Sequence, residues 1–221
     1  MGFNSSTLDA SIWGDPWSGT AGGGYNCTYE PSNISIADSV ITMQCTQSGS
    51  DFYGSGIGSY EAVMLAEKGG IWACRVKMTL SDSVDGVIFG WGADNTGTTF
   101  PEYGEQDFVE SNPYYRDPST SFAMNTHWGS NSDPQQDPLN DIGGPVADWT
   151  IYWCVWNPGE AIQVLSGSSN IDDATSIGEI NNSNITGASA YFVAEILAQA
   201  PSGGTGSVQM DWATQFSPEL H

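Results

Sequence analysis

The chain has 221 residues, with 26 Asp and Glu against 4 Lys and Arg, so its formal net charge is −22. Four cations cannot supply the basic surface that phosphate binding needs, so we expect no nucleic-acid partner. No run of about 20 apolar residues is present, which predicts no membrane-spanning helix and no membrane partner. The length is ordinary for a single all-β domain, and we expect residues 1–221 to form one monomeric domain.

Apolar residues alternate with polar ones along most of the chain, and clusters of Gly, Asn, Asp, Ser and Pro separate these runs. Short strands at this spacing predict a β-sandwich or a barrel. The stretch 131–146 has little apolar pattern and is interpreted as a long loop of the kind that often carries function. The predicted strands are 33–45 (two strands around a turn at 37–39), 71–80, 86–91, 106–111, 121–128, 149–156, 161–165, 190–198 and 206–216.

The cysteines number four, an even count that allows two disulfides without defining their pairing. Cys27 and Cys45 flank one predicted strand region and form the expected bridge, whereas Cys154 lies in an aromatic strand and is interpreted as a buried thiol. No cysteine belongs to a metal-binding spacing, which argues against zinc. The first residues show no basic-then-apolar run, so no secretion leader is visible.

The segment 105–110 places three acids within six residues on a predicted strand. Side chains alternate along a strand, so Glu105 and Asp107 share a face while Glu110 points the other way. One bulge between Asp107 and Glu110 reverses that parity and brings all three carboxylates to one face. Two facing carboxyls are what glycoside hydrolysis needs, and a third raises the pKa of the group that stays protonated. The alternative is a solvated acidic edge strand.

The pattern Glu-x-Asp-x-x-Glu at 105–110 resembles the signature of glycoside hydrolase family sixteen in its β-bulge form, which includes laminarinases, lichenases and agarases. Further segments resemble the family in the same order along nearly the whole chain. They are 8–13, 86–92, 125–128, 148–158, 162–167, 191–199 and 207–212.

The resemblance implies an all-β, concanavalin A-like jelly-roll sandwich with a concave carbohydrate cleft. It implies that Glu105 is the nucleophile, that Glu110 is the general acid and base, and that Asp107 orients the nucleophile and tunes the pair. Gln106 departs from the usual apolar residue and should point away from the cleft. The nearest relatives by pattern are secreted, so we expect an extracellular protein whose leader is not visible here.

Several further side chains are candidates for substrate binding. Flat rings suit the apolar faces of sugars, so Trp91, Trp128 and Trp149 are candidate platforms, with core packing as the alternative. His127 is a candidate hydrogen-bond partner of the three acids, and Glu195 is a candidate substrate-contacting acid that needs a partner if it is buried.

No cofactor is required by the predicted chemistry. Asp211 matches a position that holds a structural calcium in many relatives, and it is the only metal candidate.

Together these observations predict a retaining endo-β-glycanase, a glycoside hydrolase that cuts a β-linked polysaccharide by double displacement. The acidic composition favours a neutral polymer, so β-1,3-glucan or mixed-linkage β-glucan is the expected substrate. Two alternatives stay open: a non-catalytic carbohydrate-binding or surface (virion) protein on the same fold, and a transglycosylase.

Overall fold

The computed structural model describes residues 7–14, 17–21, 25–64, 69–81, 83–92, 104–111, 121–130, 132–143, 148–184, 190–199 and 203–216. In these residues, no helix is long and apolar enough to cross a membrane. Two one-turn 3-10 helices, η1 (Pro31–Asn33) and η2 (Ile171–Asp173), accompany the strands. The strands are β1 (Gly19–Thr20), β2 (Thr28–Tyr29), β3 (Ile34–Ala37), β4 (Val40–Ser48), β5 (Asp51–Met64), β6 (Gly70–Leu80), β7 (Val84–Gly92), β8 (Glu105–Glu110), β9 (Ser121–Ser130), β10 (Asp133–Gln136), β11 (Leu139–Gly143), β12 (Thr150–Asn157), β13 (Ala161–Ser166), β14 (Thr175–Asn181), β15 (Ala190–Ala198) and β16 (Gly206–Phe216).

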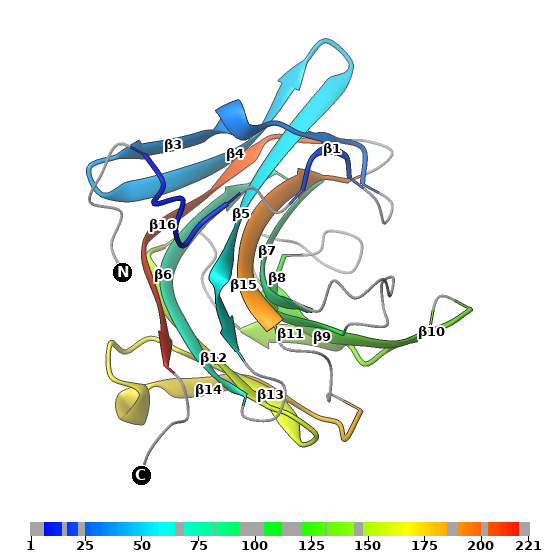
Figure 1. Cartoon of the computed structure of the whole chain (residues 1–221), viewed down its shortest axis with the longest axis vertical. Coiled ribbons are helices and arrows are strands. Elements are labelled where there is room, and N and C mark those ends of the chain that lie inside the picture. The colour runs from blue at the N-terminus through cyan, green and yellow to red at the C-terminus, as the bar shows by residue number, and fades with distance from the viewer. Residues whose placement is uncertain are drawn as a thin grey trace.

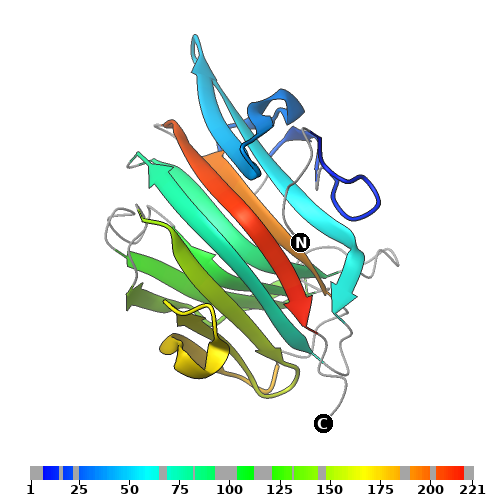
Figure 2. The ribbon, with the colours of Figure 1, turned by 90° about the vertical axis from the view of Figure 1, so that its left-hand side faces the viewer.

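The strands form two curved layers that pack face to face (Figure 1). The first layer, which we call the inner layer, has the order β10-β9-β8-β7-β15-β5, and the second, the outer layer, has the order β4-β16-β6-β12-β13-β14. The antiparallel pair of β4 and β5 joins them. In Figure 2 the outer layer, with β16 in red and β6 beside it, lies in front of β15. The architecture is the predicted jelly-roll sandwich.

The core between the layers follows from the alternation of side chains along each strand. In β6, Trp72, Cys74, Val76 and Met78 are buried, while Arg75 and Lys77 between them are partly exposed on the outer surface. Trp72 meets Phe108 of the inner layer edge-on, with ring centroids 5.8 Å apart. Burial of large side chains of this kind stabilises a fold by about 1.5–3 kcal/mol each, so these apolar faces hold the two layers together.

Strand β5 has glycine at three alternate positions, Gly54, Gly56 and Gly58, which therefore share one face. The segment before β3 lies against this part of β5. Gly14 exchanges two backbone hydrogen bonds with Gly58, and Tyr29 pairs with Gly54. A Cβ on Gly54 would lie 2.7 Å from the Leu197 side chain and 3.3 Å from the Cys27 sulfur, so the close packing here requires glycine.

The prediction of a long loop at 131–146 is wrong for most of that stretch. Residues of this stretch form β10 and β11, and both pair with β9. The reason is that the exposed backbone of β9 accepts these polar residues as strands, although they carry no apolar alternation.

The expected bridge between Cys27 and Cys45 is also absent. All four cysteines are free, buried thiols. Burial raises the pKa of the Cys27 thiol to about 11 and that of the Cys45 thiol to about 12, which keeps both protonated.

Candidate active site

The predicted bulge is present in β8. On β9, Asp107 pairs with Asn125 while Glu110 pairs with Ala123, so three steps along β8 match two steps along β9. On β7 the register also shifts, since Asp107 pairs with Phe89 and Val109 with Ile88. One extra residue therefore reverses the alternation, and Glu105, Asp107 and Glu110 lie on the same face of the inner layer.

The residues between the acids explain why the strand bulges. Phe108 and Val109 are consecutive, and both are fully buried in the core between the layers. A regular strand would place one of them on the opposite face, beside the carboxylates. Burying both apolar side chains is worth about 3 kcal/mol or more, which favours the bulged register. Gln106 points into the same interlayer space as predicted, and it is 2% exposed.

The neighbouring strands complete the face that carries the three acids. His127 of β9 lies directly opposite Glu105, and Asn125 lies opposite Asp107. On the other side, Val87 of β7 lies opposite Glu110 and Phe89 lies opposite Asp107. Sheet pairing thus surrounds the carboxylates with an imidazole, an amide and an apolar strip, a combination of groups that suits a sugar.

The carboxyl of Glu105 titrates together with its neighbours. Burial raises the pKa of Glu105 well above its ordinary value, and the charge and hydrogen bond of Asp107 raise it further, followed by the charge of Glu110. Groups coupled in this way titrate together, so the protonation of Glu105 depends on the acids beside it.

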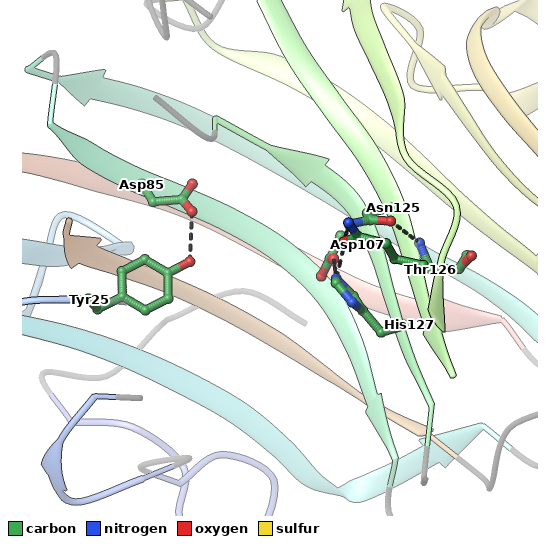
Figure 3. Close-up of polar contacts among 7 residues, drawn as sticks. Tyr25, Asp85, Asp107, Asn125, Thr126 and His127 are labelled. Carbon is green, nitrogen blue, oxygen red and sulfur yellow. Dashed lines mark hydrogen bonds and ion pairs between the residues drawn. The ribbon is translucent and has the colours of Figure 1, made fainter. Parts of the chain in front are cut away.

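The amide of Asn125 sets the hydrogen-bond geometry at His127 (Figure 3). The Thr126 backbone N–H donates to Asn125 Oδ1 at 2.9 Å, so Asn125 Nδ2 faces His127 Nε2 at 3.0 Å. His127 Nε2 also lies 3.2 Å from Asp107 Oδ2. His127 Nε2 is therefore held between the Asn125 amide and the Asp107 carboxyl.

Glu195 of β15 is the fourth predicted acid that the structure brings to this face. It lies opposite Val87, in the same cross-strand row as Glu110. It is 6% exposed, and the Tyr29 hydroxyl donates to its Oε2 at 2.9 Å. Burial raises the pKa of Glu195 to about 8, so this carboxyl is largely neutral at pH 7.

Asp85 is an acid of this face that the sequence analysis did not select. It is 1% exposed, and the Tyr25 hydroxyl donates to its Oδ2 at 2.8 Å (Figure 3). Burial raises the pKa of Asp85 to about 6. Its position in the sequence could have indicated this, because Asp85, Val87 and Phe89 alternate and therefore share one face of a strand that is otherwise apolar. Tyr25, Tyr29 and Asn125 were also missed, because only the register of the sheet brings them to the acids.

The structure does not bring every predicted tryptophan to the carboxylates. Trp128 follows His127 on β9 and therefore faces the opposite side of the strand. Trp149 precedes β12 in the outer layer, where the Arg75 guanidinium lies 4.9 Å above its ring. The backbone of Trp91 lies opposite Glu105, but its side chain lies outside the described residues.

Another aromatic group lies beside the candidate site. Phe89, Val87, Tyr191 and Val193 form a small apolar cluster on the face of the acids, and Trp17 packs against it. The Trp17 ring is stacked on Phe89 with a centroid distance of 5.9 Å and an interplanar angle of 4°. Trp17 is only partly buried, so it presents an aromatic surface beside the carboxylates.

Asp211, the predicted calcium ligand, pairs through one carboxylate oxygen with the Arg75 guanidinium. The calcium site stays a prediction. Across the described ranges, one group of three potential metal-binding side chains is found, namely Glu105, Asp107 and His127, whose donor atoms lie within 4.8 Å of one another. We assign this group to proton chemistry, because its carboxyls already share hydrogen bonds.

Comparisons with known proteins agree on the fold. No family model and no curated protein sequence matches the chain. A Bacteroides ovatus mixed-linkage-glucan family-sixteen glycoside hydrolase in complex with its product is 14% identical, with a TM-score of 0.77 over 97% of this chain and 98% of that chain. A lichenase from a mouse hindgut metagenome is 17% identical, with a TM-score of 0.72 over 97% and 96%.

The laminarinase catalytic domain of Thermotoga maritima is 11% identical, with a TM-score of 0.75 over 99% of this chain and 96% of that chain. The coverage is nearly complete in both directions for all three structures. The chain therefore has the fold of the family-sixteen glucanases from its first described strand to its last.

Proposed function

We propose that the protein is a retaining endo-β-glycanase that hydrolyses β-1,3-glucan or mixed-linkage β-glucan. The observation that carries the proposal is the bulge in β8, which places Glu105, Asp107 and Glu110 on one face. A solvated acidic edge strand, the alternative, would leave these acids exposed and would not need a bulge. Here Asp107 is 3% exposed, and β8 is paired on both sides.

In the first step, Glu110 donates a proton to the glycosidic oxygen while the Glu105 carboxylate attacks the anomeric carbon, which releases one sugar chain and leaves a glycosyl-enzyme ester. Glu105 must be ionised to attack, against the burial and the neighbouring acids that raise its pKa. Asp107 hydrogen-bonds Glu105 and lies 3.2 Å from His127 Nε2, so Asp107 and His127 orient the nucleophile.

In the second step, Glu110 acts as a base and takes a proton from water, which attacks the anomeric carbon and breaks its bond to Glu105, so the sugar leaves with its original configuration. The Trp17 ring stacked on Phe89 provides an apolar surface for a sugar ring beside the acids. Glu195, neutral at pH 7, is able to donate a hydrogen bond to a sugar hydroxyl.

The substrate class rests on charge and on the solved structures that share the fold. A chain with a net charge of −22 repels sulfated and uronic polymers, which leaves neutral glucans as the favoured substrates. The similar *Bacteroides ovatus* structure holds a glucan product, and the similar *Thermotoga maritima* protein is named a laminarinase. Polymeric glucans are found outside the cell, so we also propose that the protein acts there.

The test is the release of reducing ends from laminarin, lichenan, agarose, carrageenan and xylan by the wild type, Glu105→Gln and a control, Glu179→Gln. Glu179 lies on β14, in the outer layer, so its variant should match the wild type. We expect cleavage of laminarin or lichenan and a loss of at least about 10³-fold in Glu105→Gln, because no nucleophile remains. Proton NMR of the first product should show retained configuration.

Three results would overturn the proposal. Full activity in Glu105→Gln would exclude this residue as the nucleophile. Inactivity of the wild type on every polymer, together with binding of the same polymers in affinity electrophoresis, would identify a non-catalytic glycan-binding protein. Transfer of sugar to an added acceptor in preference to water would identify a transglycosylase.

A further inference from the structure

Asp85 is a buried acid that the proposed reaction does not use. It lies at the second position of β7 and is 1% exposed. A carboxylate without charge partners is costly to bury, so a buried acid of this kind needs hydrogen bonds or a function. Of the four cationic residues, the described Arg75 and Lys77 lie on the outer face of β6, in the other layer.

Asp85 is placed next to Glu110 by the pairing of β7 with β8. Glu110 lies directly opposite Val87, so Asp85, two residues earlier on the same face, is its diagonal neighbour. The two carboxyls are joined by a side-chain hydrogen bond. Ser111 lies beside the Asp85 carboxyl. Its Oγ accepts a hydrogen bond from the Gly86 backbone N–H at 2.8 Å and lies 3.5 Å from Asp85 Oδ1.

The Tyr25 hydroxyl fixes the other side of the Asp85 carboxyl. It donates to Oδ2 at 2.8 Å, so Asp85 is an acceptor at that oxygen. Asp85 is thus held in place by Tyr25 from the segment before β2, and its other oxygen is left for Ser111 and Glu110. A hydrogen bond between two carboxyls needs one proton, and donation from Tyr25 favours the arrangement in which Asp85 is the anion and Glu110 carries the proton.

We propose that Asp85 is a positioning residue that holds the proton on Glu110, so that Glu110 is ready to act as the general acid. This inference rests on the proposed function, in which Glu110 protonates the leaving sugar. The groups that face Asp85 are Glu110 and Asp107 from β8, Glu195 from β15, and Tyr25. The negative charge of Asp85 raises the pKa of Glu110, because ionising Glu110 would place two anions side by side.

The experiment compares Asp85→Asn and Tyr25→Phe with the wild type. The first readout is the titration of the Glu110 carboxyl carbon by ¹³C NMR, assigned by its loss in Glu110→Gln. The second is the alkaline limb of kcat/KM on the glucan that is cut. Asp173→Asn is the matched control, because Asp173 is an exposed acid in η2.

In Asp85→Asn the side chain keeps its shape and can still accept from Tyr25, but it is neutral and donates to Glu110. We expect both the Glu110 titration midpoint and the alkaline limb to move to lower pH by about one unit or more. In Tyr25→Phe the Asp85 anion loses a donor and binds the shared proton more tightly, so both midpoints should move to higher pH. Loss of structure alone would not produce opposite movements.

An unchanged Glu110 midpoint in Asp85→Asn, or movement in the same direction in both variants, would overturn the inference. The NMR titration does not depend on catalysis, so failure of the proposed function is seen separately. If no polymer is cut and the midpoints still move in opposite directions, the proton-holding pair stands and the proposed hydrolase does not. If hydrolysis is confirmed and the midpoints do not move, only this inference fails.

Discussion

Replacement of Glu195 by Gln should make the stability of the protein less dependent on pH. The ordinary pKa of a Glu carboxyl is 4.5. Below this pH the Glu195 carboxyl is protonated in both the folded and the unfolded chain, and its contribution to the free energy of unfolding is fully present. Between pH 4.5 and about 8 the unfolded chain releases this proton and the folded chain keeps it, so the free energy of unfolding falls as the pH rises. Above about 8 the folded chain ionises as well, and the loss is complete.

The magnitude follows from the same two values. Each pH unit between them is worth about 1.4 kcal/mol, so the interval from 4.5 to about 8 corresponds to roughly 5 kcal/mol as an upper figure. The amide in Glu195→Gln cannot ionise, and its oxygen still accepts from Tyr29. The variant should therefore match the wild type at pH 4 and be more stable by several kcal/mol at pH 8.5.

Urea unfolding at pH 4 and pH 8.5, followed by tryptophan fluorescence, measures this difference. Glu160→Gln is the control, since Glu160 is exposed and its variant should follow the wild type at both values. An equal difference between Glu195→Gln and the wild type at the two pH values would refute the reasoning, because it would show that Glu195 has the same pKa in both states.

Three other predictions concern the glycines, the aromatic surface and the thiols. Gly69→Ala should lower the free energy of unfolding by more than about 2 kcal/mol, since φ is +62° and the new Cβ would lie 2.1 Å from the Trp156 carbonyl oxygen. The control is Gly159→Ala, where φ is +75° but the space around the new Cβ is open, and it should lower the free energy of unfolding by about 1 kcal/mol in the same urea experiment. Trp17→Ala, made in the Glu105→Gln background, should weaken glucan-oligosaccharide binding about tenfold in calorimetry, and unchanged binding would remove Trp17 from the site. A thiol reagent should label all four cysteines after unfolding without a reductant and few before it; fewer than four labelled after unfolding would reveal a disulfide.

The catalytic strand could be predicted from the sequence because its own residues contain the reason for its shape. Acids at 105, 107 and 110 need a bulge to share a face, and the consecutive Phe108 and Val109 provide the apolar burial that stabilises it. The strands that flank it were also predictable, because their apolar residues alternate. Local pattern and tertiary packing agree in these elements.

Other parts of the molecule depend on contacts that a sequence pattern does not contain. Strand β5 shows no alternation because its alternate positions are glycines, and β10 and β11 are polar strands that form only against β9. The hydrogen bond between Tyr29 and Glu195 joins residues 166 positions apart. Such pairs follow from the register between strands, which the spacing of residues along the chain does not determine.

The glycine face of β5 has a consequence for the order of folding. The segment that lies against it carries both Tyr25 and Tyr29, which cover Asp85 and Glu195. With this segment undocked, the two carboxyls would be open to water, and carboxyls in water are ionised at neutral pH. After docking, Glu195 holds a proton. Closure of the amino-terminal segment is therefore coupled to proton uptake, so it should become slower or less complete in alkaline solution, and maturation of the site should depend on pH even when the rest of the sandwich is already formed.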